Sequence, residues 1–160
     1  MESETARWIA VQGWINHCIK EIGWAAIHVF PTPTHPNLIP FTYTIGLTSK
    51  NLPELILFGL GGKQAHGIIA SAINNLDLSK VEEYVSYNEV SKNLPVEFRN
   101  LPQSVVEEFL CQAIAYYSDK KQVRARQLIW PDAKGRFPWH TDCEPKYARY
   151  QSEAIDWRLN

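Results

Sequence analysis

The stretch from 122 to 139, with the sequence QVRARQLIWPDAKGRFPW, constrains the fold more than any other part of the chain. Its first half alternates, so that Arg124, Arg126 and Trp130 fall on one face of a predicted strand. Pro131 has no N–H to donate to a neighbouring strand and therefore ends this one. The strand thus carries two guanidinium groups and an indole on the same side.

The residues after Pro131 predict a tight turn. Asp132 and Gly135 stand at the first and last positions of a type I turn, and Gly135 can adopt a positive φ at little cost. This spacing suits a three-residue hairpin loop with a β-bulge. Segment 136–139 would then return beside the outgoing strand as an edge, which brings Trp139 close to it. We therefore predict a β-hairpin over residues 122–139.

Hydrophobic periodicity predicts the remaining elements. Strands are expected at 24–30, 41–47 and 53–60, the last of them central because it is apolar on both faces; amphipathic helices are expected at 5–22, 64–76 and 104–117, and a short helix after Pro145. Ser104 and Glu107 form a capping box for the third helix. Residues 77–101 fit a short helix, an edge strand or a loop. The prediction is one α+β domain over residues 1–160, with a mainly antiparallel sheet, a β-hairpin in the C-terminal half and three main flanking helices.

Composition and charge exclude some classes of partner. Lysine and arginine number 16 and aspartate and glutamate 17, and the net charge of −1 gives no electrostatic reason to bind nucleic acid or an anionic membrane. No apolar stretch reaches the roughly 20 residues that span a bilayer, and the first residues do not resemble a leader peptide. Cys18, Cys111 and Cys143 are odd in number and widely spaced, which indicates reduced thiols in the cytoplasm.

The segment from Gly59 to Lys63 joins a predicted strand to a predicted helix, as a phosphate-binding loop does. Such a turn offers backbone N–H groups to an anion. However, the dinucleotide fingerprint requires glycine where Gln64 stands, and the Walker pattern requires glycine at Leu57 and serine or threonine at Gln64. A structural strand-to-helix turn is therefore the favoured interpretation, and an anion site is the alternative.

The histidines and cysteines do not form a metal-binding or nucleophile pattern. His140 and Cys143 have the spacing of two zinc ligands, but the local sequence does not supply the rest of a tetrahedral site, and we predict no metal. His28 lies on a strand face beside the small Ala26, where a titratable ring could occupy a pocket. A hydrogen-bonded structural histidine is the favoured interpretation of His28.

Arg124 and Arg126 form a candidate anion site. They lie about 7 Å apart on one strand face, close enough to hold a carboxylate or phosphate between them. They could equally pair with Glu89, Glu97 or Asp132. The sequence leaves these two alternatives open.

A second candidate surface lies on the strand predicted at 41–47. Thr42 and Thr44 form its polar side, which we expect to face solvent or a ligand. The preceding residues 31–40 contain four prolines. They should form a stiff surface loop, which is either a plain hairpin connection or a ligand lid.

Three segments resemble a known family. FTYTIGL at 41–47, PELILFGL at 53–60 and QLIWPDAKGRFPW at 127–139 are similar to the bacterial family called domain of unknown function 4262. The resemblance extends from Trp24 to Trp139, and its specific part is the element Q-L-x-W-P-D-x-x-G-x-F-P-W. It implies no established activity, and it does not extend to His140 and Cys143.

Two hypotheses of function follow. The first is a non-catalytic binding module, such as a small-molecule sensor or the inhibitory partner of another protein, that takes a small anionic ligand or an acidic protein segment. The second is an enzyme or cofactor-binding protein that acts on a phosphorylated or flavin-like molecule. The candidate ligand-binding residues are His28, Thr42, Thr44, Arg124, Arg126, Trp130 and Trp139; no catalytic residue and no cofactor is predicted.

Overall fold

A computed structural model of the chain describes residues 3–91, 94–120 and 122–156. These residues form five strands, five α-helices and one short 3-10 helix. The strands are β1 (Ala25–Val29), β2 (Phe41–Ile45), β3 (Glu54–Phe58), β4 (Glu97–Asn100) and β5 (Ala125–Ile129). The helices are α1 (Glu4–Ile22), η1 (Thr48–Lys50), α2 (Gly62–Asn75), α3 (Gln103–Phe109), α4 (Cys111–Tyr117) and α5 (Pro145–Tyr150). Among these residues, no helix combines the length and the apolarity needed to cross a membrane.

The five strands form one mixed sheet in the order β1-β2-β3-β5-β4. Three of the neighbouring pairs are antiparallel, but β3 and β5 run parallel, so the sheet that was predicted to be mainly antiparallel is a mixed sheet with one parallel pair. Parallel neighbours need a long crossover, and here α2, β4, α3 and α4 lie in the chain between β3 and β5. β3 is the middle strand, as its apolar sequence predicted.

The predicted hairpin over 122–139 is wrong, although its turn is correct. Both edges of β5 are already paired, with β3 on one side and β4 on the other, so segment 136–139 has no free edge to join. Gly135 does adopt a positive φ of 80°. Its N–H donates to the Asp132 carbonyl at 3.0 Å and closes the turn.

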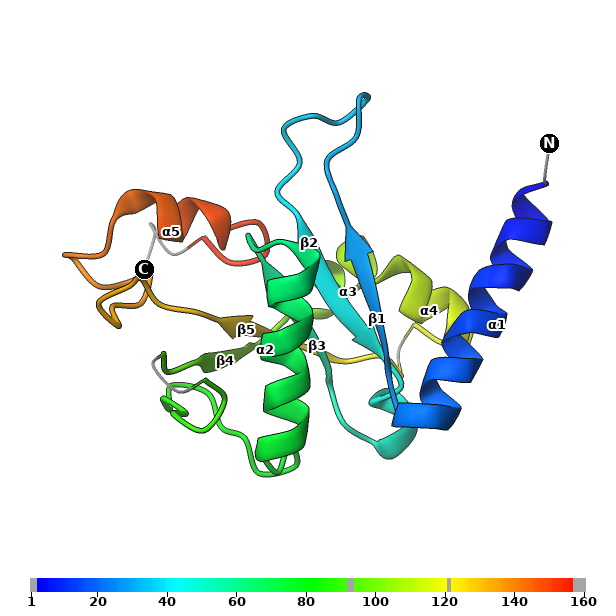
Figure 1. Cartoon of the computed structure of the whole chain (residues 1–160), viewed down its shortest axis with the longest axis horizontal. Coiled ribbons are helices and arrows are strands. Elements are labelled where there is room, and N and C mark those ends of the chain that lie inside the picture. Colours follow the sequence, from blue (N-terminus) through cyan, green and yellow to red (C-terminus); the bar gives the residue numbers. More distant parts are fainter. Residues whose placement is uncertain (1–2, 92–93, 121, 157–160) are drawn as a thin grey trace.

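Helices cover the two faces of the sheet unequally (Figure 1). One face packs against α2 through a core that includes Leu55, Leu57, Ile69, Ala72 and Leu128. The other face packs against α1, α3 and α4 through a core that includes Ile15, Tyr43, Phe58, Leu110 and Ala113. α1 and α5 lie at opposite ends of the long axis of the molecule (Figure 1).

The helix predicted at 104–117 is in fact two helices. It breaks at Leu110, whose side chain is fully buried and whose backbone has φ −96° and ψ 47°. The predicted capping box is also wrong, because Pro102 occupies the N-cap and no side chain caps this helix. The ambiguous region 77–101 contains β4, which is an edge strand, joined to the preceding loop by a bridge between Tyr87 and Val96.

Candidate functional site

A groove with a volume of about 530 Å³ lies along one side of α2. Its size falls in the range of small-molecule binding sites. Four separate segments of the chain line it: Leu60, Lys63, Gln64, Gly67, Ile68 and Ser71; Val90, Ser91 and Leu94; Trp130, Pro131 and Ala133; and Tyr147.

Two neighbouring stripes of residues on α2 have different surroundings, one facing the sheet and the other the groove. Ala65, Ile69 and Ala72 recur at helical spacing and are completely buried against the sheet. The groove-lining residues of α2 recur at three- and four-residue spacing on a neighbouring stripe. Ile68, which periodicity assigned to the core, is only half-buried because it belongs to this second stripe.

Trp130 forms a fixed wall of the groove. Its indole Nε1 donates to the carbonyl of Phe58 at 2.9 Å, and its ring meets the ring of Tyr147 edge-on at a centroid distance of 5.5 Å. Gln151 binds both main-chain groups of Trp130, accepting from its N–H and donating to its carbonyl. These contacts hold the indole in one orientation before any ligand arrives.

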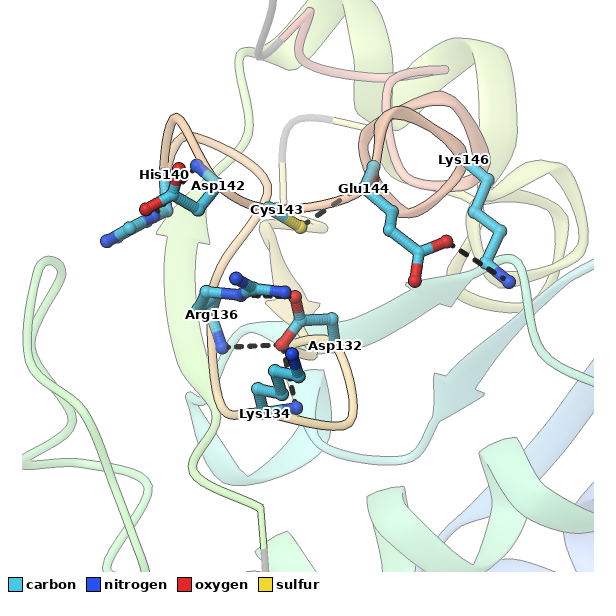
Figure 2. Close-up of polar contacts among 8 residues, drawn as sticks. All are labelled: Asp132, Lys134, Arg136, His140, Asp142, Cys143, Glu144 and Lys146. Carbon is cyan, nitrogen blue, oxygen red and sulfur yellow. Dashed lines mark hydrogen bonds and ion pairs between the residues drawn. The ribbon is translucent and has the colours of Figure 1, made fainter.

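The turn after Trp130 is held by Asp132 (Figure 2). The Asp132 carboxylate accepts from the N–H groups of Lys134 and Arg136, both at 2.9 Å, and from Nε of Arg136 at 2.8 Å. Burial by itself would raise the pKa of Asp132, but the hydrogen bonds from Arg136 and Lys134 outweigh it and lower that pKa. The ionised carboxylate therefore fixes the loop that carries Pro131 and Ala133, which form the rest of this wall.

The charge of the groove is unbalanced. Among the described lining residues, Lys63 carries the single full charge, and none is an aspartate or glutamate. The Lys63 ammonium group forms no hydrogen bond or ion pair with any residue that the structure describes. By contrast, the hydroxyl of Ser71 is committed to the carbonyl of Val90 at 2.5 Å.

The two predicted arginines bind elsewhere, and neither pairs with Glu89, Glu97 or Asp132 in the described structure. Arg124 donates to the Asn51 carbonyl at 3.0 Å. Arg126 donates to Oδ1 of Asn100 at 2.8 Å and to the carbonyl of Val81 at 2.7 Å. Both guanidinium groups therefore tie loops to the end of the sheet where β5 begins.

Trp139 lies beside β4 and not beside Arg124 and Arg126. Its ring centroid is 4.6 Å from the guanidinium of Arg99, which also lies 4.0 Å from the ring of Tyr84. Arg99 is buried and forms an ion pair of 3.0 Å with Glu97. The guanidinium partner of this indole is thus Arg99, which the sequence did not single out.

His28 is hydrogen-bonded, as the structural interpretation of this residue expects. Its Nδ1 lies 2.8 Å from the hydroxyl of Thr42, directly opposite it in the pairing of β1 and β2. Burial, and then the nearby His66, lower the pKa of His28. The rings of His28 and His66 have centroids 6.3 Å apart, and His66 stacks on Trp24.

Thr42 and Thr44 do not face solvent, so the prediction of one solvated side for this strand is wrong. Their exposed fractions are 1% and 0%. The Thr44 hydroxyl donates to the buried carboxylate of Glu54 at 2.7 Å, and the N–H of Thr48 donates to the same carboxylate at 2.7 Å. Burial raises the pKa of Glu54, against the opposing effect of these hydrogen bonds.

The side chains of His140 and Cys143 do not converge on a common point (Figure 2). The His140 ring points away from the Cys143 sulfur (Figure 2). In the described part of the chain, no group of three or more histidine, cysteine, aspartate or glutamate side chains could hold a metal ion. Burial, and then the neighbouring Asp132 carboxylate, raise the pKa of the Cys143 thiol.

A second hollow of about 350 Å³ lies beside the proline-rich loop. The loop connects the antiparallel neighbours β1 and β2. Its residues from His35 to Ile39 line the hollow together with Phe41, Phe109 and Glu153. This hollow is smaller than the α2 groove and lies on different elements.

Several lining residues of the groove were not predicted as a site. Ser71 and Tyr147 lay in segments interpreted as a core helix and a surface helix, whereas Lys63 ends the turn for which the sequence left an anion site as the alternative. One signal was present: Gly67 stands in the middle of a helix, where glycine costs about 1 kcal/mol relative to alanine. A Cβ at Gly67 would meet no atom within 4 Å, so packing of the helix does not require this glycine.

The fold and the groove define the class of protein: a mixed α+β domain that presents a preformed, mainly apolar groove. The chain belongs to the family described as domain of unknown function (DUF4262), whose model matches residues 18–144. The match extends beyond the resemblance seen in the sequence and includes the end of α1, His140 and Cys143. No curated protein and no solved structure matches the chain significantly.

Proposed function

We propose that this protein is a non-catalytic binding module that holds a small organic ligand in the groove beside α2. The observation that carries the proposal is the pre-organised wall formed by Trp130, Pro131 and Ala133. Trp130 donates hydrogen bonds to the Phe58 carbonyl and to Gln151, and Arg136 donates to Asp132 in the turn that follows, so these bonds fix the wall. A wall that is already ordered loses little conformational entropy when a ligand binds.

The chemistry of the lining supports binding over catalysis. The described lining residues include Ser71 and Ser91 but no histidine, aspartate, glutamate or cysteine, so none of those four residue types is there to act as a base that activates either hydroxyl. His28, Tyr43 and Glu54 lie on the strands of the sheet and have raised or lowered pKa values, and none of them lines the groove. We therefore favour a small-molecule sensor over an enzyme.

The proposed site is the groove beside α2 and not the pair Arg124 and Arg126. Of the candidate ligand-binding residues, Trp130 lines the groove, whereas Arg124 and Arg126 already bind main-chain or asparagine oxygens. The groove instead begins at the turn from Gly59 to Lys63, since Leu60 and Lys63 line one end of it. The cysteines, which are free in the structure, agree with our proposal of a bacterial cytoplasmic location.

Filling the groove tests the proposal. Gly67→Leu places a side chain in the groove without a clash at Cβ, and Gly13→Leu does the same on the exposed surface of α1. We expect native mass spectrometry or ligand-observed NMR with a fragment library to find ligands of the wild-type protein and the Gly13→Leu variant. The Gly67→Leu variant should fold and lose them. Ligands that bind the Gly67→Leu variant as tightly as the wild type would place the site elsewhere.

A further inference from the structure

We infer that the ligand of the groove is a small organic acid with a single anionic group, bound with that group at Lys63 and with its apolar body against Trp130 and Tyr147. This inference rests on the proposed function and specifies the chemical class of the ligand. It follows from the distribution of charge, of backbone N–H groups and of apolar surface along the groove.

The charge of the lining selects the sign of the ligand. Lys63 has no partner among the described residues, and no described lining residue could supply a compensating carboxylate. A cationic ligand would meet repulsion at Lys63 and no counter-charge among the other described lining residues. An anionic group would form an ion pair with Lys63, and such a pair at an exposed site is worth up to about 1 kcal/mol.

The first turn of α2 strengthens the same end of the groove. Gly61 is its N-cap and has no side chain with which to cap the N–H groups of this helix. Those N–H groups carry the positive end of the helix dipole. Lys63 and Gln64 belong to this first turn and both line the groove, so the helix dipole acts with the same sign as the ammonium group.

The described lining residues supply one cationic side chain to an anion. No arginine lies among them, and Lys63 is the one lysine. A diphosphate or triphosphate needs several cationic or N–H partners, as in the phosphate-binding loops whose fingerprint this turn lacks. A single carboxylate or sulfonate matches one ammonium group and an uncapped helix turn.

The rest of the groove selects an apolar body. Trp130, Pro131, Tyr147, Ile68, Val90 and Leu94 present carbon surface, and the polar groups of Trp130 are already bonded within the protein. Apolar ligand surface buried here is stabilised by about 25 cal/mol per Å². Aromatic or branched aliphatic acids satisfy both ends of the groove.

Two fluorescent probes that differ by one anionic group test this assignment. 8-Anilinonaphthalene-1-sulfonate and N-phenyl-1-naphthylamine share an aromatic body, but the second lacks the sulfonate. Their dissociation constants would be measured by fluorescence titration on the wild type and on Lys63→Gln, Lys20→Gln and Gly67→Leu. Lys20, on α1, is the control for the change in net charge.

We expect Lys63→Gln to weaken the sulfonate probe about two- to five-fold and to leave the neutral probe unchanged. Lys20→Gln should change neither, and Gly67→Leu should weaken both. If Lys63→Gln affects the two probes equally, or neither of them, the acid assignment is wrong while the groove remains the site. If Gly67→Leu changes neither probe, or the wild type binds neither, the proposed function fails together with the inference.

Discussion

Glu54 and Lys63 are both ionisable side chains beside the same sheet, but they differ in burial and in their hydrogen-bond partners. The Glu54 side chain has an exposed fraction of 0% and accepts hydrogen bonds from Thr44, Thr48 and the N–H of Leu47. Lys63 is exposed at the end of a groove and has no partner among the described residues. The Glu54 carboxylate is bound by donors of the protein itself, whereas the Lys63 ammonium group can bind a ligand.

The difference in burial and partners indicates that Glu54 contributes to the stability of the fold and that Lys63 contributes to binding. A buried carboxylate without partners would destabilise the fold, so its donors must come from the chain. Glu54 thereby joins β3 to the end of β2 and to η1, because its donors lie on those segments. An exposed ammonium group needs no such partners, and its effect should appear in binding and not in stability.

Removing the buried carboxylate should have the largest effect on stability. Glu54→Ala leaves the N–H groups of Leu47 and Thr48 and two threonine hydroxyls without their acceptor, which should cost about 3 kcal/mol in the free energy of unfolding. Lys63→Gln should change it by less than about 0.5 kcal/mol. Urea unfolding of the two variants measures both values. Similar losses of unfolding free energy in Glu54→Ala and Lys63→Gln would show that the two charged side chains do not differ in their contribution to stability.

The dependence of stability on pH should also come from Glu54. Burial raises the pKa of Glu54 above its ordinary value of 4.5, so the folded state binds the proton more tightly than the unfolded state. The stabilisation from this proton is complete below pH 4.5 and is lost as the pH rises through the folded pKa. The slope can reach about 1.4 kcal/mol per pH unit.

Glu54→Gln isolates this effect because the amide does not titrate. The unfolding free energy of the wild type minus that of the variant should fall as the pH is raised above 4.5. All other carboxylates contribute equally to the two proteins and cancel. A difference that stays constant with pH would show that Glu54 titrates normally in the folded protein.

β2 and β3 were predictable because their signals are local, whereas β4 lies in the region 77–101 that the sequence left ambiguous. The apolar run of β3 and the alternation in β2 identified both strands and the central place of β3. The same alternation could not show that the polar side of β2 is covered. Thr42 and Thr44 can be buried there because His28 and Glu54 bind their hydroxyls, and those partners come from neighbouring strands.

The hairpin and the groove were not predictable because they depend on distant segments. The turn chemistry of Asp132 and Gly135 is local and was correct, but β3 and β4 occupy both edges of β5. The groove combines α2 with Val90 and Leu94, which lie in a region without periodicity. It also needs Tyr147 from the C-terminal helix, and no spacing in the sequence connects these parts.

Gly135→Ala tests the turn that supports the groove wall. Gly135 has a φ of 80°, and a Cβ there would meet no atom within 4 Å. The cost should therefore be backbone strain alone, about 1 kcal/mol in the free energy of unfolding. Thermal or urea unfolding provides the value. No loss of stability would mean that the turn changes conformation readily and that the wall is not fixed by it.

Gly67→Ala should have the smallest effect, and its sign decides whether the groove is open in solution. Alanine in a helix interior is more stable than glycine by about 0.5–1 kcal/mol when its methyl group meets no obstacle. Gly13→Ala in α1 provides the matched reference, because a Cβ there is also free of contacts within 4 Å. Both variants should therefore gain stability by the same amount in urea unfolding. If Gly67→Ala loses stability while Gly13→Ala gains it, other parts of the chain fill the space beside Gly67. The groove is then closed in solution.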